Sequence, residues 1–276
     1  MFASIELGRR IEAAEARMMT AIAERARAQG PADAVVIEAL GAGVATFVRP
    51  DAPMTKVIGI GFDGALDEPW LVAVERAWQV RRAPLQVELA TLARYEAAQQ
   101  LAQRGYLLQA FENVLGCAPS AFAAPPSALR VEMADEREPD AWIACMADSF
   151  LAGDGTGAGS PDQFARAEVV RSMQEMLQVP GMRRYVVHQD GIMAGGASMR
   201  LDADGVAQLC GAATVPQVRR RGVQSALLAA RLRDAAAAGC DVAVITTQPG
   251  SKSQANAQKQ GFALLYARAI LVKPPA

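Results

Sequence analysis

The sequence predicts two consecutive α/β domains, and two observations support this fold class. Apolar residues make up 51% of 276 residues, which is enough for a sizeable core in a chain longer than one average domain. In addition, an order of helix, strand, helix and strand recurs with an offset of 156 residues. Gly105–Tyr106 and Gly261–Phe262 each precede an apolar stretch. Adding 156 to the predicted strand at 85–89 gives 241–245, which is also predicted to be a strand. We interpret the chain as a duplicated α/β unit.

The first half begins with a long helix. Residues 5–29 contain no glycine or proline and are rich in alanine, glutamate and arginine, which predicts one amphipathic helix ending at Gly30–Pro31. Asp67–Glu68–Pro69 is typical of a helix start, because acidic residues precede a first-turn proline. We expect further helices at 69–82 and 95–104, and strands at 35–37, 44–48, 56–60, 85–89 and 107–115.

The second half follows a segment rich in proline and small residues. Prolines 119, 125 and 126 predict a linker at 118–128 between one domain at 1–117 and another at 129–276. A glycine-rich segment at 152–160 is interpreted as a connecting loop, with a substrate lid as the alternative. We expect helices at 139–150, 162–178, 222–238 and 251–260, and strands at 129–133, 184–189, 192–201, 206–215, 241–246 and 264–272.

Composition excludes several classes of function. Lys and Arg number 28 and Asp and Glu 29, so a basic nucleic-acid-binding surface is not expected. The single histidine, His188, excludes metal sites built from two or more histidines, and we expect no metal. The four cysteines form no Cys-x-x-Cys pair, which favours a reducing compartment. Charged residues near the N-terminus and the lack of a long apolar run predict a cytoplasmic protein without a membrane segment.

The most informative segment is Val215-Pro-Gln-Val-Arg-Arg-Arg-Gly-Val-Gln-Ser225, which follows a predicted strand and opens a predicted helix. Three arginines at the positive end of a helix dipole are unfavourable unless an anion is present. Free helix amides together with arginines suit a pyrophosphate. The alternative is a solvated turn that happens to be rich in arginine.

This segment resembles the cofactor loop of the GNAT superfamily of N-acetyltransferases, whose pattern is Arg/Gln-x-x-Gly-x-Gly/Ala. The following strand and the helix that ends at Gly261–Phe262 occur in the order typical of that family. The resemblance implies two GNAT-like domains, each a mixed, mostly antiparallel sheet flanked by helices, with acetyl-CoA as co-substrate in the second. It assigns cofactor binding to Val215, Arg219, Arg220, Arg221, Gly222, Val223, Gln224, Ser225 and Asn256.

Several positions depart from the family pattern. Gln224 stands where the motif has Gly or Ala, and its side chain would crowd the pyrophosphate unless it turns away and donates a hydrogen bond. Gln208 occupies the place of a catalytic Glu, and Ala257 that of a Tyr that protonates the leaving thiolate. Tyr266 is the nearest alternative phenol and our catalytic candidate, with a buried core tyrosine as the other interpretation. His188 as a base and proton removal through water stay open.

The first half contains a second glycine-rich segment, Gly59-Ile-Gly-Phe-Asp-Gly64, which fits a dinucleotide-binding pattern. Asp63, Asp67 and Glu68 would face the pyrophosphate, so we consider a Rossmann-type oxidoreductase a distant third interpretation. The offset of 156 puts residues 63–65 on Arg219–Arg221, so this half has lost the basic loop. It resembles the degenerate first domain of tandem GNAT proteins.

The resemblance implies transfer of an acetyl group to a primary amine of a small molecule or peptide. A non-catalytic acyl-CoA-binding or sensor module is the alternative, because the expected Glu and Tyr are absent. No nucleic acid or membrane is expected as a partner, and a homodimer is left open.

Overall fold

We analysed a computed structural model that describes residues 1–275 apart from 32–33, 125–126, 135–138 and 153–163. The described chain forms two compact units. The N-terminal unit contains Phe2–Val114 and Leu265–Ala276, and the C-terminal unit contains the described residues of 115–159 and 165–264. The predicted boundaries of 1–117, 118–128 and 129–276 stay a prediction, although the last strand of the chain lies mainly in the N-terminal unit.

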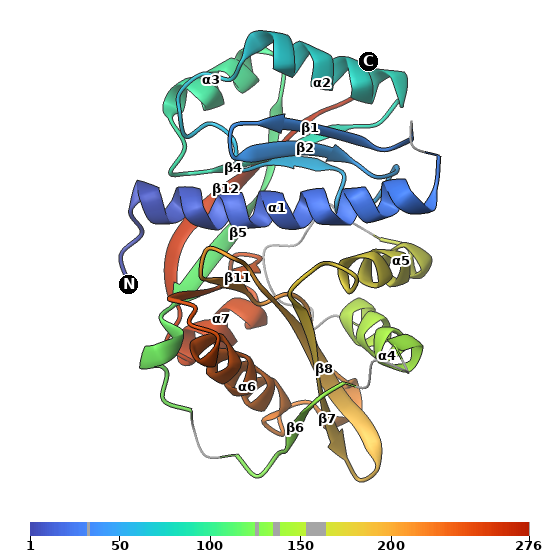
Figure 1. Ribbon diagram of the computed structural model, residues 1–276, viewed down its shortest axis with the longest axis vertical. Coiled ribbons are helices and arrows are strands. Elements are labelled where there is room, and N and C mark those ends of the chain that lie inside the picture. Colours follow the sequence, from blue (N-terminus) through green and yellow to red (C-terminus); the bar gives the residue numbers. More distant parts are fainter. Residues whose placement is uncertain (32–33, 125–126, 135–138, 153–163, 276) are drawn as a thin grey trace. The chain divides into compact units, whose positions relative to one another are not determined.

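The N-terminal unit is a mixed sheet between helices (Figure 1). Strand pairing is antiparallel for β1–β2, β2–β3 and β4–β12 and parallel for β3–β4. Helix α1 packs on β2, while α2 and α3 share an apolar core with β2 and β4. The elements are α1 (Ile5–Gln29), β1 (Val36–Leu40), β2 (Gly43–Phe47), β3 (Lys56–Ile58), α2 (Glu68–Val80), β4 (Leu85–Ala90), α3 (Tyr95–Gln103), β5 (Leu107–Cys117) and β12 (Ala263–Lys273).

The C-terminal unit has the same kind of sheet. Its pairs β6–β7, β7–β8, β8–β9 and β8–β10 are antiparallel, and β9–β11 is parallel. Helix α6 packs on one face of this sheet and α4 on the other. The elements are β6 (Val131–Met133), α4 (Pro139–Leu151), α5 (Arg166–Met176), β7 (Met182–Gln189), β8 (Ile192–Leu201), β9 (Val206–Gln208), β10 (Ala212–Thr214), α6 (Val223–Ala237), β11 (Val242–Thr247) and α7 (Lys252–Lys259).

The two units repeat the same local geometry, which confirms the predicted fold class. Adding the offset to β5 gives the bounds of β12, and α3 is followed by Gly105 as α7 is followed by Gly261, both with φ of 85°. Tyr106 N donates to Leu101 O, and Phe262 N donates to Ala257 O, so equivalent bonds end both helices. The structure therefore contains a duplicated α/β unit.

Two observed features differ from the sequence-based expectations. The strand expected at 206–215 is interrupted between Gln208 and Ala212, so it forms the separate strands β9 and β10. The last strand, β12, pairs with β4 through Arg268↔Ala90 to Lys273↔Leu85, which joins the end of the chain to the N-terminal unit. The predicted loop at 152–160 lies almost entirely outside the described residues.

Candidate cofactor site in the C-terminal unit

The site begins where β10 diverges from β11. Strand β9 pairs with β11 as far as the hydrogen bond from Leu209 N to Val244 O, which measures 2.9 Å. Strand β10 then pairs only with β8 among the described strands, so the parallel ladder ends there. We call this place the strand divergence: β10 (Ala212–Thr214) on one side and residues 245–247 of β11 on the other.

A β-bulge produces the divergence. Gln208 pairs with Arg200, whereas Ala212 pairs with Ala197, so β9 and β10 contain one residue more than β8 over this stretch. Ser198 N donates to both Cys210 O and Gly211 O, at 3.2 and 3.0 Å. A bulge bends the strand that carries it, and here it separates β10 from β11. The sequence offered no local signal for this bulge beyond Gly211, which has a φ of 27°.

The bulge also sets the direction of the peptide groups of β10. Gly211 O accepts from Ser198 on β8, and Val215 N donates to Ala194 O on β8. Backbone groups alternate in direction along a strand, so the carbonyls of Ala212 and Thr214 point away from β8, towards the strand divergence. The amides of these two residues therefore face the strand divergence as donors, while their carbonyls accept from Gln224 Nε2 and Arg219 Nε, each at 3.4 Å.

The loop between β10 and α6 has the geometry of an anion site. After the short 3-10 helix η3 (Pro216–Val218), Arg220 has a φ of 66° and Gly222 a φ of 83°. No side chain caps α6, and its first backbone hydrogen bond within the described residues runs from Ala226 N to Gly222 O. The amides of Val223, Gln224 and Ser225 are thus available in the described chain, and the positive dipole end adds to their attraction for an anion. Left-handed backbone at a non-glycine residue such as Arg220 is often found at functional sites.

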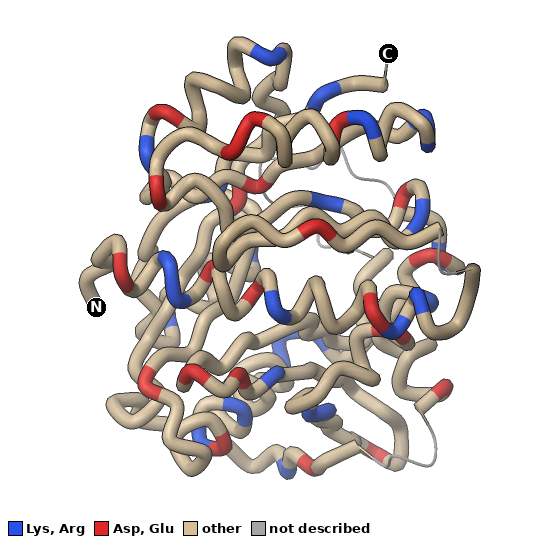
Figure 2. The backbone as a smooth tube through the Cα atoms, turned by 45° about the horizontal axis from the view of Figure 1, so that its top comes forward, with Lys and Arg blue, Asp and Glu red and all other residues tan. Residues whose placement is uncertain are grey.

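The three arginines of the loop have different surroundings. Arg219 is half-buried, and its Nε donates to Thr214 O at 3.4 Å while its Nη2 donates to Ser149 O at 3.5 Å. Arg220 and Arg221 are exposed. Basic and acidic residues are interspersed along most of the chain (Figure 2), so this run is a local concentration of positive charge. Arg219 holds the loop to its neighbours, and Arg220 and Arg221 are the arginines exposed for an anion.

Gln224 turns away from the helix amides, as its place in the motif requires. Its Nε2 donates to Ala212 O at 3.4 Å, and its Oε1 accepts from Asn256 Nδ2 at 3.5 Å. Ser225 Oγ accepts from Gln260 Nε2 at 3.4 Å. The structure thus brings together Gln224, Ser225 and Asn256, and Val215 packs against the core beneath them. The side chain of Gln224 leaves the amide face of α6 open.

Two buried hydroxyl groups flank the strand divergence. Thr214 is 8% exposed and Thr247 is 5% exposed, and neither Oγ1 atom has a hydrogen-bond partner within the described residues. Ala212 and Ile245, two residues earlier on each strand, pack into the core that contains α6, so strand alternation puts both hydroxyls on that face. Buried hydroxyls usually have a partner, and these two are among several buried polar atoms, such as Trp78 Nε1, that have none within the described residues.

The sequence-based catalytic candidates have other surroundings. Tyr266 belongs to the N-terminal unit, where its hydroxyl donates to Glu12 Oε1 at 2.7 Å. Burial, followed by the charge of Glu12, holds the pKa of Tyr266 well above its ordinary range, which makes this phenol a poor proton donor. The structure does not place Tyr266 with the cofactor loop, and its contacts favour the alternative of a core tyrosine.

Buried side chains occupy the two positions where the family pattern has a catalytic Glu and a Tyr. Gln208 is 3% exposed and accepts from Arg200 Nη1 at 2.7 Å, while Ala257 is 2% exposed in the core. His188 lies near the end of β7, with Nδ1 4.0 Å from Glu132 Oε2, and it is about half exposed. No group of three or more potential metal-ligating side chains occurs among the described residues.

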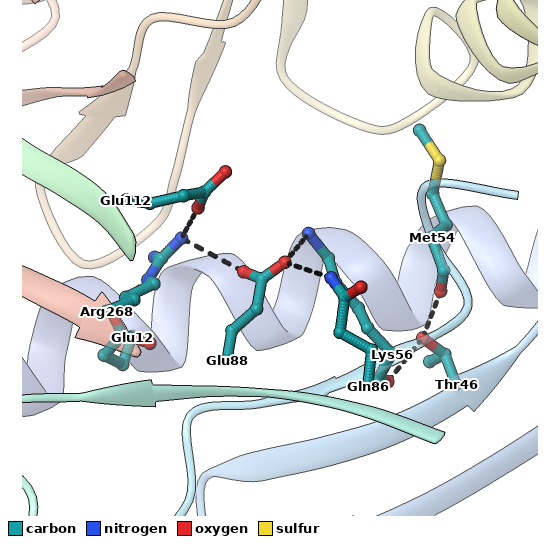
Figure 3. A network of polar contacts seen from close by, with 8 residues as sticks. All are labelled: Glu12, Thr46, Met54, Lys56, Gln86, Glu88, Glu112 and Arg268. Atoms are coloured by element: carbon teal, nitrogen blue, oxygen red, sulfur yellow. Dashed lines mark hydrogen bonds and ion pairs between the residues drawn. The ribbon is translucent and has the colours of Figure 1, made fainter. Parts of the chain in front are cut away.

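In the N-terminal unit the equivalent strands do not diverge. The offset places β3 on β10 and β4 close to β11, yet β3 pairs directly with β4 through Val57↔Val87 and Ile58↔Glu88. Lys56 Nζ lies 2.7 Å from Glu88 Oε1, so an ion pair joins the two strands (Figure 3). The following loop carries Asp63 and Asp67, and Asp67 caps α2 by accepting from Trp70 N. At the positions equivalent to β10, β11 and α6, this unit has no divergence, and the equivalent helix, α2, is capped by an acidic residue.

Comparison with known proteins assigns the C-terminal fold. Residues 154–262 match the sequence model of the Acetyltransferase (GNAT) family. The chain contains a GNAT domain. No curated protein matches the chain.

Solved structures extend the likeness to both halves. A GCN5-related N-acetyltransferase from Kribbella flavida is 20% identical, with a TM-score of 0.64 over 95% of this chain and 96% of that one. A GCN5-related N-acetyltransferase from Sphaerobacter thermophilus gives a TM-score of 0.56 at 14% identity, over 74% of this chain and 66% of that one. A tandem GNAT protein from the clavulanic acid biosynthesis pathway gives 0.54 at 15% identity, over 74% and 68%. At these identities the likeness shows the fold, and it confirms two GNAT-like units in tandem.

The GNAT domain thus carries the strand divergence and the uncapped basic start of α6, whereas in the N-terminal GNAT-like unit β3 and β4 stay paired and Asp67 caps the equivalent helix α2. Among the described residues, no helix has the length and apolar character needed to cross a membrane.

Proposed function

We propose that the protein transfers an acetyl group from acetyl-CoA to a primary amine of a small molecule or peptide, using one cofactor site in the GNAT domain. The observation that carries this proposal is the uncapped start of α6 beside the exposed Arg220 and Arg221. It lies next to the strand divergence, where β10 no longer pairs with β11. A diphosphate suits free helix amides and arginines, and an amide-containing arm suits the backbone groups of Ala212 and Thr214. The unpartnered hydroxyls of Thr214 and Thr247 fit the same ligand.

When bound, acetyl-CoA would supply an activated thioester. The chain itself would bind the diphosphate with the amides of 223–225, hold the loop through Arg219, and keep Gln224 clear of the helix start. Proton removal from the amine is assigned to water, because Gln208 is bound to Arg200 and Ala257 has no ionisable group.

A second candidate function is binding of acyl-CoA without catalysis, for which the same cofactor site would serve. Gln208 and Ala257 favour it, because neither side chain can act as a general base or acid. The two functions make the same prediction for cofactor binding and differ only in turnover.

Acetyl-CoA is expected to raise the melting temperature, while NAD is expected to leave it unchanged. A ligand at 100 times its dissociation constant stabilises the folded state by about 2.7 kcal/mol. Thermal unfolding with each ligand tests the cofactor, and an absent shift in folded protein would contradict the proposed site. Release of free thiol with a panel of amines and peptides then separates an acetyltransferase from a binding module.

Replacing Arg221 with Ala is expected to weaken acetyl-CoA binding by roughly 1–3 kcal/mol, the usual contribution of a hydrogen bond to a charged group. Arg221 is exposed at the start of α6, so folding should be unaffected. Calorimetry with acetyl-CoA and with pantetheine provides the measurement, because pantetheine has no diphosphate. Equal losses for the two ligands would mean that Arg221 does not contact the diphosphate.

A further inference from the structure

Arg231 is a buried cation in the middle of α6, outside the cofactor loop. It is 2% exposed, and burial lowers its pKa to about 10. Its side chain donates to three backbone carbonyls: Nε to Leu227 O at 3.3 Å, and Nη1 to Ser198 O at 3.2 Å and to Cys210 O at 3.5 Å. None of these partners is a carboxylate, so the positive charge is stabilised by dipoles alone. A buried charge of this kind is costly, which makes a packing role a poor explanation for it.

The two carbonyls that Arg231 contacts on the sheet belong to the β-bulge. Cys210 is one of the two residues whose carbonyls face Ser198 N, and Ser198 also donates its hydroxyl to Cys210 O at 3.2 Å. Arg231 thus connects α6 to both strands of the bulge at the point where β9 ends. The same helix carries the uncapped amides at its start, so one rigid element meets the loop and the bulge.

We propose that Arg231 is a positioning residue that fixes the bulge at Cys210–Gly211 against α6 and thereby keeps β10 apart from β11. This role rests on the proposed function, since the divergence matters only if a ligand lies along β10. In the N-terminal unit the position that the offset assigns to Arg231 is Glu75, whose carboxylate accepts from Arg104 and approaches Lys273 at 2.9 Å. Within the described residues, Glu75 thus makes no contact like that of Arg231 with a bulge, and strands β3 and β4 stay paired.

The test compares Arg231→Met with Arg231→Lys and with Tyr185→Phe. Met has a similar length without charge or donors, and the hydrogen bonds of Arg231 to carbonyls include no carboxylate that the change would leave without its cation. Tyr185→Phe is the matched control, because it removes a 2.8 Å hydrogen bond from Tyr185 to Asp234 on the same helix and leaves in place the hydrogen bonds of Arg231 to carbonyls. Each variant is examined by thermal unfolding, by calorimetry with acetyl-CoA, and by hydrogen exchange without ligand.

Arg231→Met is expected to remain folded, to bind acetyl-CoA at least tenfold more weakly, and to exchange the amides of Ser198 and Leu209 faster than the wild type. Arg231→Lys retains the charge and should recover part of the affinity, and it replaces the Met variant if that one does not fold. Tyr185→Phe should match the wild type in affinity and exchange. Unchanged exchange and affinity in a folded Arg231 variant would overturn the proposal.

The two proposals fail in different ways. A wild-type protein that binds no acetyl-CoA contradicts the proposed function, whereas the exchange of Ser198 and Leu209 in ligand-free protein still decides whether Arg231 holds the bulge. A lower melting temperature with unchanged affinity of the folded protein would assign Arg231 a purely structural role and overturn its positioning role.

Discussion

Gly222→Asp is expected to abolish acetyl-CoA binding while leaving the fold intact. Gly222 has a φ of 83°, which an aspartate tolerates at a modest cost, and a Cβ there would meet only Leu129 Cδ1 at 3.9 Å. The new carboxylate would stand at the start of α6, where each diphosphate charge about 4 Å away is repelled by about 1–4 kcal/mol at an effective dielectric constant between that of water and 20. A loss of at least about 100-fold follows, measured by calorimetry with acetyl-CoA.

Two controls separate the causes of that loss. Gly222→Asn has nearly the same shape without the charge, so it should lose much less affinity. Gly64→Asp introduces the same side chain in the N-terminal unit, at a φ of 116° with no atom within 4 Å of the new Cβ. It should leave acetyl-CoA affinity unchanged. A loss of binding with Gly64→Asp, or undiminished binding with Gly222→Asp, would mean that the cofactor site is not at α6.

Arg268→Met is expected to destabilise the N-terminal unit by about 3–5 kcal/mol, the usual effect of removing one partner of a buried ion pair. Arg268 is 2% exposed, and its guanidinium lies 2.8 Å from Glu12, 3.5 Å from Glu88 and 3.7 Å from Glu112 (Figure 3). Without it these carboxylates lose their shared cation. Urea unfolding provides the measurement, with hydrogen exchange to locate the loss in β4 and α1.

The effect should depend on pH. Burial, followed by the charge of Glu88, raises the pKa of Glu112 to about 7, while Lys56 and Arg268 hold the pKa of Glu88 below its ordinary value against the effect of burial. Loss of Arg268 disfavours the ionised form of each glutamate in this cluster. In the unfolded chain glutamates ionise near pH 4.3, so the stability deficit should grow as pH rises above that value and shrink as the carboxylates become protonated.

Arg9→Met is the matched control for this prediction. Arg9 also forms an ion pair in the N-terminal unit, at 2.8 Å from Asp63, but its side chain is 40% exposed and that of Asp63 is 80% exposed. Such pairs contribute about 0–1 kcal/mol. A loss from Arg268→Met no larger than that from Arg9→Met would show that the buried cluster does not stabilise the unit.

The sequence was sufficient for most local elements and for the position of the loop that opens α6. Helix 5–29 coincides with α1, and the repeat at Gly105 and Gly261 recurs as equal φ angles and equivalent capping bonds. These features are local: periodicity, a cap or a glycine determines each of them. The arginine run likewise marked the start of α6, because its position depends on a few neighbouring residues.

Features that depend on distant contacts were not predictable. Nothing near Tyr266 or Arg268 indicates that both contact Glu12, more than 250 residues away in the sequence. The bulge at Cys210–Gly211 depends on one extra residue relative to β8, which no local pattern within 206–215 reveals. The orientation of Gln224 depends on Ala212 and Asn256, so only the structure shows that it leaves the helix amides open.

The number of acetyl-CoA molecules bound per chain tests the central claim most directly. The C-terminal unit has a strand divergence and an uncapped helix start, whereas β3 and β4 stay paired in the N-terminal unit and Asp67 caps α2. Calorimetric titration of the full chain should therefore give one acetyl-CoA per chain, and none in Gly222→Asp. Two per chain, or one that persists in Gly222→Asp, would contradict a single site in the GNAT domain.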